Sequence, residues 1–544
     1  MPAKGPEEPL AVAQTLAPEL LDIIFHFVED EIVDLGEHRA PPCMPLSHVC
    51  RRWRTVALAC RALWSTSLPR ISQEWTDICL ARCPSTPLNV YIDERNFWSE
   101  SRRAAVASVM QDHWSWVKVL GLSLELPRTV TGRPDLSGAC KLGLEAVLRF
   151  LTRPNDQLEV LLFDFGLEVG LGIDDWIPND YKIPMDIFSS QPPCLLRDIR
   201  LVRCSLPRAP LPQLFTHSLR TLHLANTRAW RDVDNMIQYF RCMPMLETLT
   251  YKFFLEAYLF DCTPSRTHQA SRCVSLPHLK SLDLEGHWIR NLSIINYIAI
   301  PSTCRITTQS IAWDHEEHYG PVPQNVVLDI TAMCAESLQR HFSLATSRNI
   351  VYPIVMIQDL AIVAERKSAK GAMPIAEGTE LPAKLQLNLP FPDSSALNER
   401  AAFRAYLSQP VLTGAKHLYF KERPYKLCPD VFDGYVNVQL LTIAEYADAE
   451  AFTAGLRSRG ASLFPSLRRV VFVQYIINSA RPDVLREMAL ALRDTLGARA
   501  AFDCLELSLC LGVTEETENK IRAILGSERF VRSEWPTELG AILD

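Results

Sequence analysis

The sequence predicts a mixed α/β fold, in which a short helical segment precedes a long, irregular array of strands and helices. With 544 residues, the chain is too long for one ordinary compact core, so it forms several domains or one extended array. Apolar residues make up 48% of it and charged residues 22%, which is typical of a folded chain. Apolar residues recur at helical spacing between residues 16 and 64, and at strand spacing after about residue 90.

Two short amphipathic helices are predicted within the first 64 residues. The first has Pro18 and Glu19 in its first turn, where a missing N–H costs little and a negative charge meets the helix dipole. Its apolar stripe consists of Leu16, Leu20, Ile23, Ile24 and Phe27. The second helix begins near Pro45, and its stripe consists of Leu46, Val49, Cys50, Trp53, Val56, Ala57 and Cys60. Two helices cannot bury this much apolar surface alone, so the excess packs on the rest of the chain or on a partner.

These residues resemble the F-box of fungal F-box proteins. The family pattern L-P-x-E-L-L-x-x-I-F corresponds to Leu16–Phe25, the pattern V-C-R-R-W-R-x-(V/I)-A-L to Val49–Leu58, and the closing L-W to Leu63-Trp64. The chain departs from the family in having Ala17 before Pro18, where a second proline is common, and in a longer link over residues 29–44. The alternative interpretation is a generic helical hairpin around a tryptophan core.

After about residue 90 the sequence returns repeatedly to one short pattern. The fullest copy runs from Leu196 to Leu206 and matches the leucine-rich-repeat signature L-x-x-L-x-L-x-x-(N/C)-x-L at every position. Copies that begin at residues 196, 219, 246 and 279 are 23, 27 and 33 residues apart, which is an irregular period. The partial copies are Val117, Leu120, Leu122; Leu158, Leu161, Phe163; Leu219, Leu222, Leu224; Leu246, Leu249, Tyr251; Leu279, Leu282, Leu284; Val438, Leu441, Ile443; Leu467, Val470, Phe472; and Cys504, Leu507, Leu509.

Helical stretches are predicted between these copies, at residues 142–151, 230–240, 396–407, 449–456 and 484–496. Alternating apolar residues in each copy are typical of a strand with one buried face. A repeated strand, loop and helix is the unit of a leucine-rich-repeat solenoid. The alternative is a doubly wound α/β domain, which the absence of a glycine-rich first turn disfavours.

The chain is therefore expected to form an N-terminal three-helix F-box followed by an irregular leucine-rich-repeat-like α/β solenoid. Residues 261–272 and 365–383 are expected to form loops. The expected boundaries are 1–14 for a flexible N-terminus, 15–70 for the F-box, 71–110 for a linker and capping segment, 111–300 for the first array, 301–383 for an irregular segment and loop, and 384–544 for the C-terminal array.

No pattern in the sequence indicates catalytic, cofactor or metal chemistry. His315 and His318 are three residues apart with glutamates between them, which is not the H-E-x-x-H spacing of zinc proteases. The segment Gly170-Leu171-Gly172 lacks the third glycine of a dinucleotide-binding loop. Neither a G-x-x-x-x-G-K-(S/T) loop nor a G-x-S-x-G motif occurs. The sixteen cysteines contain no C-x-x-C pair, so we expect free thiols in a reducing compartment.

Charge and hydropathy also restrict the partners and the location. The formal net charge of -7 disfavours broad binding to nucleic acid or to a membrane surface. The first eight residues contain no apolar secretory region, and no apolar run is long enough to span a bilayer. We therefore expect a soluble intracellular protein, cytoplasmic or nuclear, with no nucleic-acid partner and no membrane partner.

The resemblance implies the substrate-recognition subunit of a Skp–cullin–F-box ubiquitin ligase. Such a subunit binds a Skp-type adaptor through its F-box, holds an unknown target protein on its repeat array, and makes no bonds itself. The adaptor-binding residues would be Leu16, Pro18, Leu20, Leu21, Ile24, Leu46, Val49 and Trp53. Leu63 and Trp64 would close the F-box core. The alternatives are an F-box-containing binding scaffold without a ubiquitin-ligase role, and an enzyme with an unrecognised site in the C-terminal half.

Overall fold

The computed structural model describes residues 16–33, 43–124, 138–165, 183–206, 213–253, 260–268, 270–309, 323–358, 361–366, 381–389, 396–421, 429–473, 481–497, 502–510 and 513–533. The chain divides into two compact units, Met1–Ala229 and Trp230–Asp544. The expectations for residues 1–14, 170–172 and 315–318, and for most of the loop 365–383, lie outside the described residues. Among the residues that are described, no helix is long and apolar enough to cross a membrane.

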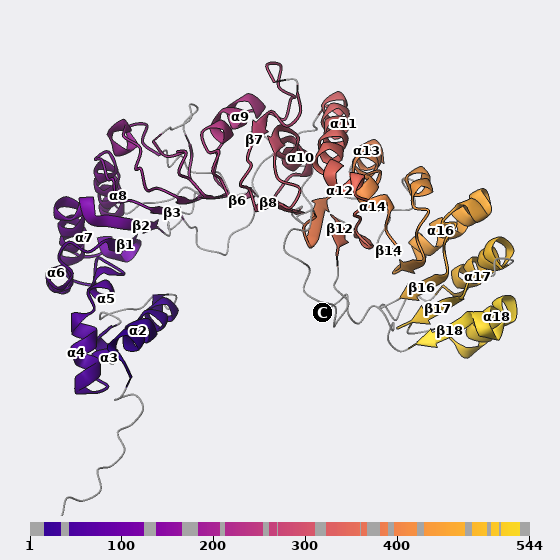
Figure 1. Ribbon diagram of the computed structural model, residues 1–544, viewed down its shortest axis with the longest axis horizontal. Helices are drawn as coiled ribbons and strands as arrows, with labels where there is room; N and C mark the ends of the chain where they lie inside the picture. The colour runs from indigo at the N-terminus through magenta and orange to yellow at the C-terminus, as the bar shows by residue number, and fades with distance from the viewer. Residues whose placement is uncertain are drawn as a thin grey trace, which may run out of the picture. The chain divides into compact units, whose positions relative to one another are not determined.

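Short helices form the N-terminal segment of the first unit; they are α2 (Pro18–Val33), α3 (Cys43–Ser47), α4 (Arg51–Ala59) and α5 (Arg61–Ser65) (Figure 1). The core of this segment includes the fully buried Leu21, Phe25, Ala57 and Leu63. The ring of Phe25 packs on that of Trp53 with the centroids 5.2 Å apart. Trp64 is also buried, and its Nε1 donates a hydrogen bond to the Ala57 carbonyl at 3.0 Å. These contacts hold α2 and α5 against α4.

The sequence predicts a single helix from Leu46 to Cys60, and this is wrong. Helix α3 ends at Ser47 and α4 begins at Arg51, with Val49 in the turn between them. The backbone of Cys50 is extended, with φ -158° and ψ 172°, and its Sγ accepts a hydrogen bond from the Trp53 N–H at 3.5 Å. Cysteine counts as apolar in a periodicity argument, so its role as the cap of α4 was not visible in the pattern.

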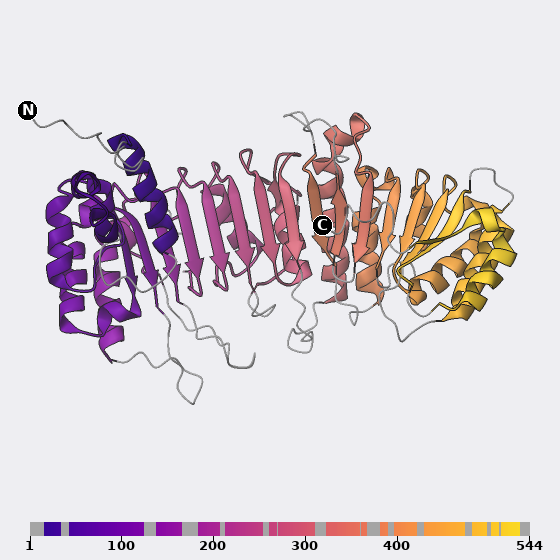
Figure 2. The ribbon, with the colours of Figure 1, turned by 90° about the horizontal axis from the view of Figure 1, so that it is seen from below.

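The first unit contains a sheet in the order β1-β2-β3-β4-β5, with every neighbouring pair parallel. Helices α6, α7 and α8 lie on one face of it (Figures 1 and 2). Leu68, which follows α5, pairs with Val90 at the edge of this sheet. The elements in chain order are α6 (Gln73–Arg82), β1 (Leu88–Asp93), α7 (Glu100–Asp112), β2 (Val117–Ser123), α8 (Gly138–Leu151), β3 (Val160–Asp164), β4 (Asp198–Val202) and β5 (Thr221–Ala225).

The second unit contains strands in the order β6-β8-β10-β13-β12-β11-β14-β15-β16-β17-β18. Its strands are β6 (Thr248–Lys252), β8 (Ser281–Glu285), β10 (Arg305–Gln309), β11 (Ile354–Gln358), β12 (Ala361–Glu365), β13 (Lys384–Asn388), β14 (His417–Phe420), β15 (Leu440–Ile443), β16 (Arg469–Val473), β17 (Cys504–Ser508) and β18 (Phe530–Ser533). Strand β12 is antiparallel to both of its neighbours, and the other pairs are parallel. A separate parallel pair joins β7 (Val274–Ser275) to β9 (Ile298–Ala299).

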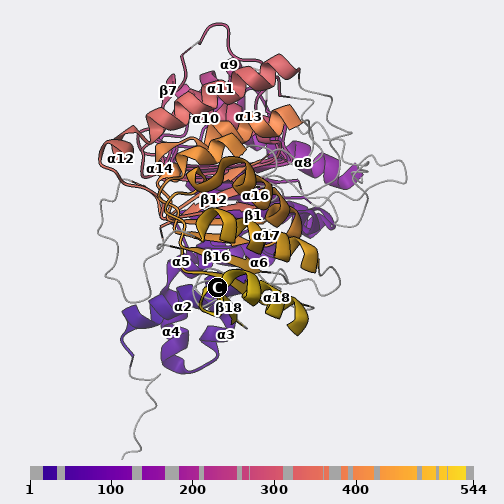
Figure 3. The same ribbon diagram turned by 90° about the vertical axis from the view of Figure 1, so that its right-hand side faces the viewer.

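The helices of the second unit lie on one face of its sheet, and α16, α17 and α18 pack against one another in succession (Figures 1 and 3). They are α9 (Val233–Arg241), α10 (Trp288–Tyr297), α11 (Gln324–His341), α12 (Ser343–Ser347), α13 (Ala396–Leu407), α14 (Pro410–Thr413), α16 (Tyr446–Arg459), α17 (Pro482–Leu496) and α18 (Glu515–Leu525). All five predicted helical stretches coincide with helices, namely α8, α9, α13, α16 and α17. The prediction of a mixed α/β fold is therefore confirmed.

The repeated pattern marks the buried face of each sheet. In the first unit, Leu120, Leu161, Ile199 and Leu222 lie in one register row across β2 to β5, and all four are fully buried. The next residue on each strand points to the opposite face, away from α6, α7 and α8. The pattern L-x-x-L-x-L thus places one residue before the strand and two inside it, all on the buried face of the sheet.

The structure shows which elements the predicted segments contain. Residues 71–110, expected as a linker and cap, contain β1, which pairs with β2 along its length. The irregular segment 301–383 contributes β10, β11 and β12 to the sheet. The last repeat copy is displaced by two residues, because the buried residues with the spacing of the pattern are Phe502, just before β17, and Leu505 and Leu507 within it. A phenylalanine replaces the first leucine of that copy, so the pattern was matched in the wrong register.

Candidate functional site

Helix α2 is apolar on two faces, and only one of them is buried. Leu21 and Phe25 face the core, whereas the side chains of Leu20, Ile23 and Phe27 are 49%, 52% and 72% exposed. The latter three recur at i, i+3 and i+7, so they share one face of the helix. We call this group the α2 apolar surface. Exposed apolar residues that gather on one face mark interaction sites in soluble proteins.

The eight residues that the resemblance assigned to adaptor binding differ in their exposure to solvent. Pro18, Leu20 and Val49 are exposed, and Leu16, Ile24 and Trp53 are half-buried. Leu21 and Leu46 are buried, so their side chains support the surface from beneath. The set omitted Ile23 and Phe27, although both stand in the same predicted stripe. Their spacing from Leu20 was the signal that would have found them.

Two arginines of α4 form hydrogen bonds within the N-terminal helical segment. The Nη2 of Arg52 donates a hydrogen bond to the Leu16 carbonyl at 2.6 Å, just before α2 begins. The Nε of Arg54 donates to the Ser47 carbonyl at 3.0 Å, where α3 ends. These two side chains fix the start of α2 and the end of α3 against α4, so they hold the exposed residues of α2 in place.

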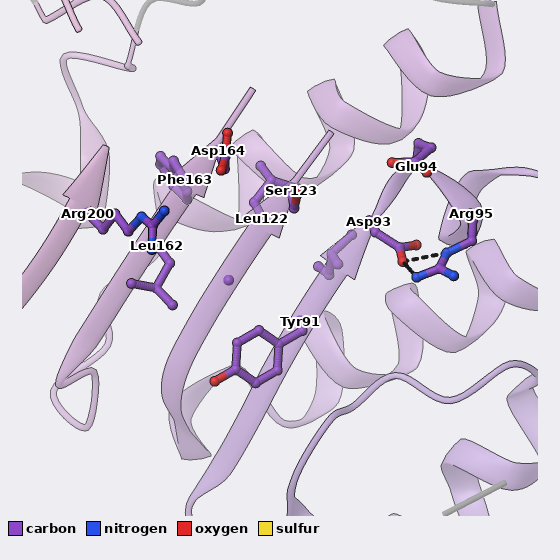
Figure 4. Close-up of a pocket in the computed structure, with 12 residues that line it drawn as sticks. Tyr91, Asp93, Glu94, Arg95, Leu122, Ser123, Leu162, Phe163, Asp164 and Arg200 are labelled. Carbon is purple, nitrogen blue, oxygen red and sulfur yellow. Dashed lines mark hydrogen bonds and ion pairs between the residues drawn. The ribbon is translucent and has the colours of Figure 1, made fainter. Parts of the chain in front are cut away.

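A second candidate site is a cavity of about 590 Å³ on the helix-free face of the first unit (Figure 4). Its lining comes from β1, β2, β3 and β4, and includes Tyr91, Asp93, Leu162, Asp164 and Arg200. Register explains why these residues meet, because Tyr91, Gly121, Leu162 and Arg200 occupy one row across the four strands. A Cβ on Gly121 would lie 2.5 Å from the Tyr91 Cδ1, so the glycine leaves room for the tyrosine ring over β2.

The two aspartates of this cavity differ in their environment. Asp93 accepts hydrogen bonds from the Nε and Nη2 of Arg95 at 2.8 and 2.5 Å (Figure 4). Burial raises the pKa of Asp164, and the positive charges of Arg200 and Arg203 offset only part of that effect. The cavity therefore combines an aromatic side chain, a desolvated carboxyl group and an exposed arginine with apolar residues such as Leu162, which suits a segment that carries both polar and apolar groups.

The helix-free face of the second unit is different at its centre. Met356, Val363, Tyr419, Val471 and Val473, from β11, β12, β14 and β16, form a buried apolar cluster there. Beside it on β17, the fully buried Glu506 accepts a hydrogen bond from the Nε of Arg469 at 3.0 Å. This region is filled by its own side chains, so the cavity of the first unit is the more open candidate.

A cluster of a carboxylate, two hydroxyls and a histidine lies at the start of α9. The Oδ1 of Asp234 accepts hydrogen bonds from Ser265 Oγ at 2.5 Å and Thr267 Oγ1 at 2.7 Å, and lies 3.1 Å from His268 Nδ1. A hydrolytic triad needs the carboxylate and the hydroxyl at opposite ring nitrogens, whereas here both face Nδ1. The arrangement instead anchors the loop that contains residues 261–268 to α9.

Comparison with known proteins adds no assignment to this geometry. No known family model matches the chain, and no curated protein matches it.

Proposed function

We propose that this protein is the substrate-recognition subunit of a Skp–cullin–F-box ubiquitin ligase. In this proposal α2 to α5 form the F-box, and the strands and helices that follow form a leucine-rich-repeat-like array. The observation that carries the proposal is the α2 apolar surface. Leu20, Ile23 and Phe27 stay exposed although the opposite face of the same helix is packed into a core. A helix of this kind needs a partner to cover its second apolar face.

The proposed mechanism is tethering, and it requires no catalytic residue from this chain. The adaptor connects the F-box to a cullin with its RING subunit, and the array holds a target protein close to the charged ubiquitin-conjugating enzyme. Holding two reactants together replaces a bimolecular encounter by one at high effective concentration. The chain therefore contributes two binding surfaces and the distance between them.

The cavity lined by Tyr91, Asp164 and Arg200 is the proposed contact point for the target. It lies on a sheet face that the helices leave open, and its side chains come from four adjacent strands. Hydrogen bonds and charges in such a hollow fix the orientation of a bound segment, while the flanking strands provide contact area.

The test is co-purification of the full chain with a Skp-type adaptor, a cullin and its RING subunit. The matched pair of variants is Leu20→Ala/Ile23→Ala/Phe27→Ala on α2 and Leu328→Ala/Leu344→Ala/Leu397→Ala on helices of the second unit. Both sets replace exposed apolar residues, so both should preserve the fold. The proposal expects the adaptor and cullin to be lost with the first variant only.

The same experiment distinguishes the alternatives. If the adaptor is retained by the wild-type chain but no cullin or ubiquitin transfer accompanies it, the protein is a scaffold that uses the adaptor for another purpose. If the wild-type chain does not bind the adaptor, the F-box assignment fails, and the Asp164 cavity becomes the place to look for another activity.

A further inference from the structure

Three side chains with metal-binding groups meet where α2 packs against the junction of α4 and α5. Asp22 and His26 are four residues apart on α2, and Cys60 is the residue between α4 and α5. One ligand atom from each, the aspartate oxygen, the imidazole nitrogen and the thiol sulfur, lies within 4.8 Å of the other two. Within the described part of the chain, this is the one group of three such residues that comes together.

The contacts within this group are already close to those of a metal shell. The Sγ of Cys60 donates a hydrogen bond to Asp22 Oδ1 at 2.6 Å, and His26 Nε2 lies 4.0 Å from the same oxygen. Zinc binds carboxylate oxygen, imidazole nitrogen and thiolate sulfur at about 2.0–2.3 Å, which places tetrahedral ligands roughly 3.3–3.6 Å apart. Small side-chain movements would therefore suffice, because the observed separations fall on both sides of that range.

The ligand types and their exposure also favour zinc. Thiolate and imidazole ligands select zinc over magnesium and calcium, which prefer oxygen ligands only. The Asp22 and His26 side chains are 45% and 40% exposed, so an ion can reach them from solvent. Cys60 is half-buried. Three protein ligands leave one position of a tetrahedral shell, which a water molecule would fill.

We propose that Asp22, His26 and Cys60 bind one zinc ion, which joins α2 to the junction of α4 and α5. Binding replaces the S–H bond of Cys60 by a zinc–sulfur bond and releases the thiol proton to solvent, without oxidation or reduction. In the metal-free protein, the Cys60 thiol donates its proton to Asp22 Oδ1. Zinc must displace that proton, and its affinity should fall as the pH is lowered.

The consequence lies on the adjoining face of the same helix. Asp22 and His26 are interspersed along α2 with Leu20, Ile23 and Phe27, the members of the α2 apolar surface. An ion that holds Asp22 and His26 to Cys60 would fix the rotation of α2 about its axis and hence the direction of those apolar side chains. Because Cys60 lies 34 residues after His26 and 38 after Asp22 in the sequence, no spacing rule for zinc motifs would detect the site.

The test is titration of the metal-free full-length protein with Co²⁺ and then Zn²⁺, followed by absorption spectroscopy. The proposal expects one equivalent of tetrahedral cobalt with a thiolate-to-cobalt charge-transfer band, which zinc abolishes. Cys60→Ser should remove the charge-transfer band. Cys194→Ser, which alters an exposed cysteine of the same unit, should retain it. Zinc should also raise the temperature of unfolding of the wild-type chain and of Cys194→Ser, but not of Cys60→Ser.

Two further variants keep the test decisive if Cys60→Ser does not fold. Asp22→Asn and His26→Gln preserve hydrogen-bonding groups, and each should weaken cobalt binding at least tenfold. Absence of a stoichiometric thiolate band in the wild-type chain would overturn the proposal. A band that survives in Cys60→Ser, or that is lost equally in Cys194→Ser, would do the same. Adaptor binding plays no part in these readouts, so the zinc site stands or falls separately from the proposed function.

Discussion

In the strands of both units, the leucines of the repeated pattern are completely buried, whereas on α2 three apolar side chains face solvent. Leu201 on β4 and Leu20 on α2 are the same residue type on regular elements of the first unit. The first is fully buried on the inner face of the sheet. The second lies on a helix whose core-facing side is already occupied by Leu21 and Phe25. Fully burying one such side chain contributes about 1.5–3 kcal/mol.

This difference shows that the two regions use apolar residues for different ends. The strand-bearing region buries its own leucines, so these residues should matter for the stability of the fold. Its exposed strand face should matter for binding. The helical segment leaves apolar side chains of α2 exposed. These side chains should therefore contribute to binding a partner and little to the stability of the fold. The predictions below test this division from both sides.

The largest expected effect is on the strand-bearing region. Leu201→Asp places an uncompensated charge in a fully buried position and should lower the free energy of unfolding by about 4 kcal/mol or more. Its neighbour Arg200 points to the helix-free face, so Arg200→Ala should change that free energy by less than about 0.5 kcal/mol. Urea unfolding followed by circular dichroism measures both. Equal losses in the two variants would contradict the assignment of faces.

A smaller effect separates the two faces of α2. Leu21→Ala removes a fully buried side chain and should lower the free energy of unfolding of the helical segment by about 2–4 kcal/mol. Leu20→Ala removes a half-exposed side chain and should cost less than about 0.5 kcal/mol. Thermal unfolding of the two single variants makes the comparison. If Leu20→Ala proves as destabilising as Leu21→Ala, the α2 apolar surface is part of a core and not a surface that binds a partner.

The pH dependence tests the buried interior of the second unit. Burial lowers the pKa of His417 from 6.5 to about 4 and, with the charge of Arg272, that of His341 to about 3. Between these values and 6.5, only the unfolded chain binds the protons, so stability should fall as the pH drops below about 6.5. The expected loss is roughly 2 kcal/mol per histidine between pH 7 and pH 5.

Unfolding measured at pH 7, 6 and 5 checks this expectation. His417→Gln keeps a group that can contact the Thr442 hydroxyl, which lies 3.0 Å from the His417 Nε2, but it cannot take up a proton. The variant should therefore lose less stability on acidification than the wild-type chain. An identical loss of stability in the variant and the wild-type chain would show that His417 does not contribute to the pH dependence of unfolding.

The leucine pattern predicted most strands of the array, because leucine at two alternating positions is what a strand beneath a helix requires. Other strands were not predicted because residues other than leucine occupy the same buried positions. Tyr352, Val355 and Ile357 occupy them at β11, and Ala415, Leu418 and Phe420 occupy them at β14. The break before α4 was not predicted for another reason. Cys50 caps the helix through its sulfur, but the pattern counts cysteine as an apolar residue.

The candidate sites were less accessible to sequence reasoning than the fold. The α2 apolar surface was present in the predicted stripe, but periodicity alone could not say which of its members would face the core. The cavity beside Tyr91 depends on strand register, which brings together residues 91, 121, 162 and 200. The group of Asp22, His26 and Cys60 depends on how α2 packs. Both are products of tertiary contacts, so no local spacing encodes them.

The most direct test of the proposed function is the affinity of the full chain for a Skp-type adaptor, measured by isothermal titration calorimetry. Truncation of three exposed anchors in Leu20→Ala/Ile23→Ala/Phe27→Ala should raise the Kd at least about 100-fold, or roughly 3 kcal/mol. Leu328→Ala/Leu344→Ala/Leu397→Ala should leave the Kd within about twofold of the wild-type value. An unchanged Kd in the α2 variant, with its fold intact by circular dichroism, would contradict the claim that this surface is an adaptor-binding site.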